Sequence, residues 1–236
     1  MNTETSKIIT IKNAPRFLGA AFLFVIFTSL TGGILFMSAT GSGSISDMLV
    51  NISKNATPMR LGILDGMLNS TGIVVLAVLL YVVLRQQDKN LSLIALGSWL
   101  AEAIVYAFMQ IGALALISLS LDFVAAGAPA SSFYQTLGAF LYNGVYGQGL
   151  MIHMWFYCTG GLLWYYMFYK SRYIPRAISL FGLLAVTLAL AGIVFQVMGY
   201  AVPIYVSLPI LPFELIIGIW LLLKGIKGQQ LLQTQV

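Results

Sequence analysis

Residues 60–90 read RLGILDGMLNSTGIVVLAVLLYVVLRQQDKN, which is an apolar run that begins at a single arginine and ends in a short polar break. A second apolar run follows this break at once and continues to residue 121. A bilayer core about 30 Å thick is crossed by about 20 apolar residues in a helix that rises 1.5 Å per residue. Both runs are long enough to cross a membrane, and residues 85–90 are expected to form a tight turn at its surface.

Composition extends this interpretation to the whole chain. Of 236 residues, 59% are hydrophobic and only 8% are charged, whereas soluble domains carry about 25% charged residues. We therefore expect an all-α integral membrane protein, with residues 1–236 forming a single membrane domain that is a bundle of six transmembrane helices. The expected spans cover residues 17–37, 60–84, 91–121, 150–169, 177–198 and 208–223.

Positive charge gathers at alternate breaks between these spans. The cations at those breaks are Lys7, Lys12, Arg16, Arg85, Lys89, Lys170, Arg172, Arg176, Lys224 and Lys227. The other breaks contain only Lys54 and Arg60. Because Lys and Arg are retained on the cytoplasmic side of a bilayer, the pattern predicts a multi-pass plasma-membrane protein with both termini in the cytoplasm. Topology also explains the net charge of +5, so we expect lipid and not nucleic acid as a partner.

Three further segments lead to expectations about structure. Residues 47–59 are expected to form an external connection, with Met48, Leu49, Val50 and Ile52 at the surface. Residues 134–169 are too long for one simple span, and their glycines indicate an extra external or re-entrant helix before span four. The aromatic residues between 155 and 169 are typical of lipid contact and of the aromatic belt at a membrane interface.

Ionisable side chains inside the spans each cost about 2.5–3.5 kcal/mol to insert, so each needs a structural or functional reason. From the helical rise, Glu214 lies about 15 Å, Glu102 about 18 Å, His153 about 25 Å and Asp65 about 30 Å above the cytoplasmic ends of their spans. Arg60 lies at the outer rim. This distribution predicts a polar pocket that opens to the outside.

Helical spacing adds neutral polar residues to this pocket. Tyr106 and Gln110 follow Glu102 at intervals of four residues, and Asn69 follows Asp65 at the same interval, so each set shares a helix face. The full set of candidate ligand-binding residues is Glu102, Glu214, His153, Tyr106, Asp65, Arg60, Asn69 and Gln110.

Structural roles for the same residues stay open. A membrane glutamate can be protonated and hydrogen-bond to a neighbouring span, which holds the helices together. Arg60 and Asp65 can form a simple ion pair at the interface. The one cysteine, Cys158, excludes an internal disulfide. We expect no cofactor, although Glu102, Glu214 and His153 together have the chemistry of a carboxylate-rich metal site.

Several short motifs resemble an uncharacterised prokaryotic membrane family known as domain of unknown function 4386. The motifs that carry the resemblance are Met59-Arg60-Leu61-Gly62, Asn90-Leu91-Ser92-Leu93, Leu100-Ala101-Glu102-Ala103, Ser171-Arg172-Tyr173-Ile174-Pro175-Arg176 and Pro212-Phe213-Glu214-Leu215. The resemblance covers residues 15 to 228 and implies a small membrane protein of about six helices. It supplies no activity or cofactor, but it includes Arg60, Glu102 and Glu214.

Three functions are compatible with these observations. The first is an outward-facing pocket that binds or translocates a small polar ligand, a cation or a proton. The second is an interaction or anchoring subunit, alone or in an oligomer, in which the polar residues only join helices. The third is an intramembrane metal-dependent enzyme that acts on a lipid or another apolar substrate.

Overall fold

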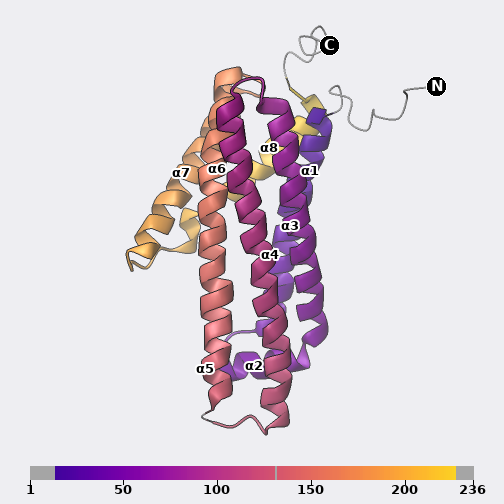
Figure 1. The fold of residues 1–236 in the computed structure, drawn as a ribbon, viewed down its shortest axis with the longest axis vertical. Helices are drawn as coiled ribbons and strands as arrows, with labels where there is room; N and C mark the ends of the chain where they lie inside the picture. The colour runs from indigo at the N-terminus through magenta and orange to yellow at the C-terminus, as the bar shows by residue number, and fades with distance from the viewer. Residues whose placement is uncertain (1–13, 131, 227–236) are drawn as a thin grey trace, which may run out of the picture. The chain divides into compact units, whose positions relative to one another are not determined.

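The computed structural model describes residues 14–130 and 132–226, and these residues form helices joined by short connections, with no strand among them. The elements, shown in Figure 1, are α1 (Ala14–Thr40), α2 (Ile45–Lys54), α3 (Ala56–Leu84), α4 (Lys89–Ala125), α5 (Phe133–Ala139), the π-helix η1 (Phe140–Gln148), α6 (Gly149–Ser171), α7 (Arg176–Val197), the 3₁₀-helix η2 (Ile204–Val206) and α8 (Ile210–Lys224).

Five helical segments in the described residues are long and apolar enough to cross a membrane, namely α1 from Pro15, α3, α4, α7 and the run Ile204–Lys224 that contains α8. The expected fourth span forms α6, whose 23 residues include histidine, tyrosines and glycines that lower its mean hydropathy. The chain is therefore an all-helical membrane protein whose helices contact lipid. A count of six spans and cytoplasmic termini stay predictions.

The segment before α6 continues directly into that helix, and its external or re-entrant position stays a prediction. Residues 133–171 are helical without interruption, because α5 passes directly into η1 and η1 passes directly into α6. A π-helix bonds each N–H to the carbonyl five residues earlier and so fits extra residues into a helix without ending it. The surplus length of this segment is taken up inside the helical run.

The described residues fall into two compact units. Unit 1 comprises the residues up to Ile26, Val74–Trp99 and the residues from Tyr157 onward, and unit 2 comprises Phe27–Ile73 and Leu100–Phe156. Four helices, α1, α3, α4 and α6, contribute residues to both units. The expectation of a single membrane domain stays a prediction.

The core of unit 2 includes α2, the short helix that lies across the long helices of this unit in Figure 1. The expected exposure of Met48, Leu49 and Ile52 is wrong, since all three are buried there. They recur at helical spacing, so they face the core together.

A capping box begins α2, in which Asp47 accepts hydrogen bonds from the backbone and side chain of Ser44. These hydrogen bonds lower the pKa of Asp47.

The core of unit 1 contains a cluster of aromatic rings. Trp99 on α4 stacks on Tyr157 of α6 and meets Trp164 edge to face. Phe213 on α8 meets Tyr165 of α6 in the same edge-to-face way, with ring centroids 4.5 Å apart. Trp164 and Tyr165 are fully buried, so their expected contact with lipid is wrong.

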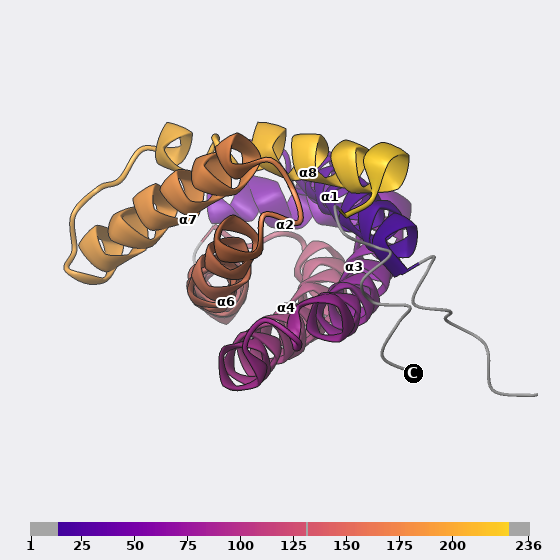
Figure 2. The same cartoon turned by 90° about the horizontal axis from the view of Figure 1, so that it is seen from above.

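Helices α7 and α8 also belong to unit 1 and pack against each other. Figure 2 shows the chain passing from α7 through the loop that carries η2 into α8. Gly182 of α7 permits this contact, because a Cβ atom there would overlap the ring of Phe213. Large apolar side chains on α7, such as Leu184 and Phe195, are exposed and suit contact with lipid.

Candidate functional site

Three polar residues lie on one face of α4 in unit 2. Glu102, Tyr106 and Gln110 recur every four residues and are all buried. The carboxyl-bearing Glu102 is only 3% exposed, which matters because the surrounding helices are almost entirely apolar. This face therefore presents a carboxyl, a phenol and an amide inside the unit.

His153 of α6 faces the first two of these residues. Its Nδ1 atom lies 3.8 Å from Oε1 of Glu102, and its ring centroid lies 4.9 Å from that of Tyr106. Direct hydrogen bonds between nitrogen and oxygen span about 2.7–3.2 Å, so the imidazole and carboxyl face each other without one. Within the described residues, the buried Nδ1 atom has no hydrogen-bond partner.

The two candidate residues of α3 turn towards α1. Asp65 accepts a hydrogen bond of 3.1 Å from Oγ1 of Thr31, and Asn69 donates one of 2.8 Å to Oγ1 of Thr28. Gly32 makes room for this contact, because a Cβ atom there would lie 2.7 Å from Oδ2 of Asp65. Sequence reasoning missed both threonines, although their spacing of three residues in an apolar span was a usable signal.

Gln110 lies where α4 approaches α3. Its amide donates to the carbonyl oxygen of Tyr106 at 3.1 Å, and its side chain packs against Gly66. Gly62, four residues before Gly66, contacts Leu35 and the backbone of α1 instead. The two glycines therefore allow close approach to two different helices.

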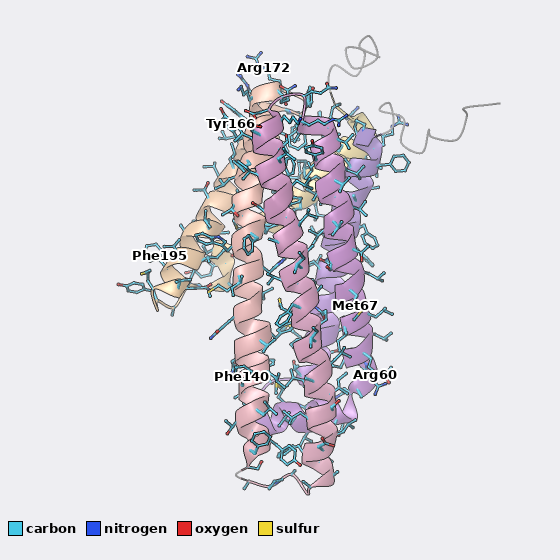
Figure 3. All side chains as sticks on the ribbon, viewed as in Figure 1. Arg60, Met67, Phe140, Tyr166, Arg172 and Phe195 are labelled. Carbon is cyan, nitrogen blue, oxygen red and sulfur yellow. The ribbon has the colours of Figure 1, made fainter. Side chains whose placement is uncertain are left out.

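Arg60 does not form the ion pair that we considered with Asp65. Its side chain is exposed and points away from α3 in Figure 3. Five residues separate the two, which places them about 140° apart around the helix. Glu102 instead has His153 as the nearby side chain that can carry a positive charge.

Glu214 belongs to unit 1 and has a different set of partners. The hydroxyl of Tyr157 donates to its Oε1 at 2.9 Å, and the hydroxyl of Tyr165 lies 3.3 Å from that of Tyr157. The indole N–H of Trp99 donates to the backbone carbonyl of Tyr157 at 3.1 Å, which fixes this part of α6. The candidate set omitted Tyr157 and Tyr165, although Tyr157 follows His153 by one helical turn.

Within each unit, the candidate residues have contacts of their own. The described structure pairs Glu102 with His153 and Tyr106, links Asp65 and Asn69 to α1, and joins Glu214 to two tyrosines in the other unit. No group of three or more His, Cys, Asp or Glu side chains among the described residues is arranged to hold a metal ion.

Comparison with known proteins assigns the chain to a family. The model of a family described as "Domain of unknown function (DUF4386)" matches residues 17–225. The chain belongs to the DUF4386 family. The match spans all six of the expected helices and includes Glu102, His153 and Glu214. No curated protein and no solved structure matches this DUF4386 chain.

Proposed function

We propose that this DUF4386 protein is a multi-pass plasma-membrane protein that binds a proton or a small cation at Glu102 and His153. The observation that carries the proposal is a buried carboxyl group that faces the buried Nδ1 atom of a half-buried imidazole at 3.8 Å, with no direct hydrogen bond between the two side chains. Such a pair can change its number of bound protons, or admit a third charged group, without first breaking a hydrogen bond between the carboxyl and the imidazole.

The charges of unit 2 favour a cation as the ligand. Its described residues include four carboxyl groups, those of Asp47, Asp65, Glu102 and Asp122, and only two cationic side chains, Lys54 and Arg60. Both cations are exposed, so neither neutralises Glu102. In a region of low dielectric constant, a carboxyl group gains more from a nearby cation than it does in water.

Tyr106 offers a second contact to the same ligand. Its ring is tilted by 46° to that of His153, and its hydroxyl is carried on the same helix face as Glu102. The face of an aromatic ring attracts cations, with an energy of about 2 kcal/mol where water is excluded. Glu102 would supply the charge, His153 would accept or release the proton, and Tyr106 would position the cation.

Proton release on cation binding tests this proposal. The purified full-length chain would be placed in weakly buffered detergent with a pH-sensitive dye, and sodium, potassium or tetramethylammonium chloride would be added separately. We expect saturable proton release with at least one of these cations in the wild type. Glu102→Gln should abolish the release, and His153→Gln should reduce its stoichiometry or shift its pH dependence.

Glu214→Gln is the matched control, because it removes the same charge from a carboxyl group that already accepts a hydrogen bond from Tyr157. It should release protons like the wild type. Absence of saturable release in the wild type, or equal release in Glu102→Gln, would reject the site.

A second candidate function, an interaction or anchoring subunit, is favoured by the other polar contacts. Ser70 of α3 donates to the carbonyl oxygen of Ala103 on α4 at 2.8 Å, and Asn69 and Tyr157 make similar bonds between helices. Polar groups used in this way hold helices together. If that is also the role of Glu102, then Glu102→Gln will lower thermal stability, and no cation will release protons from the wild type.

A further inference from the structure

A strongly cationic surface lies at the helix ends of unit 1. Seven exposed cations occur at the starts of α1, α4 and α7 and at the ends of α3, α6 and α8, and they are Arg16, Arg85, Lys89, Lys170, Arg172, Arg176 and Lys224. The described residues of unit 1 include only two carboxyl groups. Glu214 is buried against Tyr157, and Asp88 accepts a hydrogen bond of 3.0 Å from the backbone of Leu91. Among the described residues of unit 1, no other carboxyl group is present to balance these seven cations.

One hydrogen bond joins the two turns that carry most of these cations. The amide of Gln87, in the turn between α3 and α4, donates to the hydroxyl of Tyr173, in the turn between α6 and α7, at 2.8 Å. Arg85 and Lys89 flank the first turn, and Arg172 and Arg176 flank the second. The two turns that carry these pairs of cations are thus joined by a side-chain hydrogen bond.

Aromatic rings support two of the arginines. The guanidinium of Arg176 lies 5.1 Å from the ring centroid of Tyr169, and that of Arg85 lies 5.9 Å from the ring centroid of Tyr81. A guanidinium over a ring keeps the N–H groups at its edge available, and their fork matches the oxygens of a phosphate group. Both arginines can therefore bind an anion while their guanidinium groups stay in contact with a tyrosine ring.

Arg172 has a backbone conformation that is unusual for an arginine. Its backbone has a φ of 57°, in the left-handed region that glycine adopts without steric cost. An arginine at this position is conformationally unfavourable, yet its side chain is exposed at the end of the helix in Figure 3. The position therefore retains a cation where glycine would fit the backbone better.

We propose that this surface binds the headgroup of an anionic phospholipid, with Arg85, Arg172 and Arg176 contacting its phosphate. Cations next to the ends of membrane helices attract anionic lipids by about 1 kcal/mol each, which is about fivefold in affinity. A phospholipid fits better than a soluble anion, because exposed apolar side chains such as Leu180 of α7 and Leu223 of α8 belong to the same unit and can contact its acyl chains. This inference does not depend on the site at Glu102.

The test is lipid binding by the full-length chain purified in a neutral detergent. Native mass spectrometry would count bound dioleoyl-phosphatidylglycerol and dioleoyl-phosphatidylcholine over a range of lipid concentrations. We expect tighter binding of phosphatidylglycerol by the wild type, and about fivefold weaker binding in each of Arg85→Gln and Arg176→Gln.

Arg172→Gly gives the sharpest comparison. Glycine relieves the left-handed backbone, so the melting temperature without lipid should stay equal or rise. Affinity for phosphatidylglycerol should nevertheless fall about fivefold. Lys54→Gln and Arg60→Gln, which remove exposed cations of unit 2, are matched controls and should bind phosphatidylglycerol like the wild type.

Three results would overturn the proposal. One is equal affinity of the wild type for the two lipids, which would leave the cations as topological signals only. Another is unchanged phosphatidylglycerol affinity in Arg172→Gly, Arg85→Gln and Arg176→Gln. The third is displacement of phosphatidylglycerol by an equal concentration of inorganic phosphate, because the site would then bind the free anion and not a lipid.

Discussion

Glu102 and Glu214 each place a carboxyl group inside an apolar helix, and the atoms that meet each carboxyl oxygen decide what the group can do. Oε1 of Glu214 receives a hydrogen bond of 2.9 Å from Tyr157, which itself lies in a packed cluster of rings. Oε1 of Glu102 instead faces Nδ1 of His153 at 3.8 Å. The first arrangement suits a link between helices, and the second suits a change of protonation or of ligand.

The bond between Tyr157 and Glu214 gives a prediction about stability. Tyr157→Phe leaves a buried acceptor without its donor and should destabilise the protein by about 1 kcal/mol. Glu214→Gln keeps an oxygen that can accept the same bond, so it should cost less. Melting temperatures in detergent, followed by tryptophan fluorescence, would measure both effects.

Tyr166→Phe is the control for this comparison, since Tyr166 is exposed on the same helix. It should melt like the wild type. If Tyr157→Phe also melts like the wild type, the bond to Glu214 contributes nothing to stability, and its structural interpretation is wrong.

The insertion cost of charged groups was enough to select Glu102, Glu214, His153 and Asp65 from the sequence. It was not enough to pair them, because helical spacing shows which residues share a face but not which helix that face meets. His153 and Glu102 are 51 positions apart, and only the neighbouring arrangement of α4 and α6 brings them together. Arg60 and Asp65 are close in sequence, but the turn of one helix separates them.

Single helices were predicted better than their contacts. The apolar run expected over residues 60–84 forms α3, whose first residues include Pro58, and proline is tolerated in the first turn because its missing N–H has no partner there. The expected span 177–198 forms α7 (Arg176–Val197). The helix α2 was missed because ten partly polar residues are too short for a span, although Met48, Leu49 and Ile52 mark an apolar face.

Close helix packing in unit 1 gives a prediction for α1. A Cβ atom at Gly19 would overlap the backbone nitrogen of Leu222 and lie 2.7 Å from the carbonyl oxygen of Gly218, both on α8. Backbone atoms cannot move aside as a flexible side chain can, so Gly19→Ala should force the helices apart. We expect a loss of about 1–3 kcal/mol, as for other overpacked sites, and a lower melting temperature.

Gly33→Ala offers a control on the same helix, because a Cβ atom there has nothing within 4 Å. Alanine favours a helix over glycine by up to about 1 kcal/mol, so this variant should be as stable as the wild type or more so. Equal melting temperatures for the two variants would contradict the close contact between α1 and α8.

Charge is divided unevenly between the two units, although the units are defined by packing alone. The described part of unit 1 contains seven Lys and Arg residues and two carboxyl groups. The described part of unit 2 contains two Lys and Arg residues and four carboxyl groups. The alternation of cations along the sequence predicts that each break rich in Lys and Arg faces the cytoplasm. The turn between α3 and α4 and the segment between α1 and α2 are therefore expected on opposite sides of the membrane.

Labelling of single cysteines in intact cells would test this topology. Cys158 is the chain's only cysteine and is buried, so Cys158→Ala supplies a background without reactive thiols. In this background, Ser42→Cys and Gln86→Cys each place a thiol at an exposed position between helices. Because translocation of Arg85 and Lys89 is disfavoured, a membrane-impermeant maleimide should label Ser42→Cys in intact cells and Gln86→Cys only after permeabilisation. The reverse order of labelling would mean that the cationic turn is external, and the lipid surface proposed for unit 1 would then face the outer leaflet.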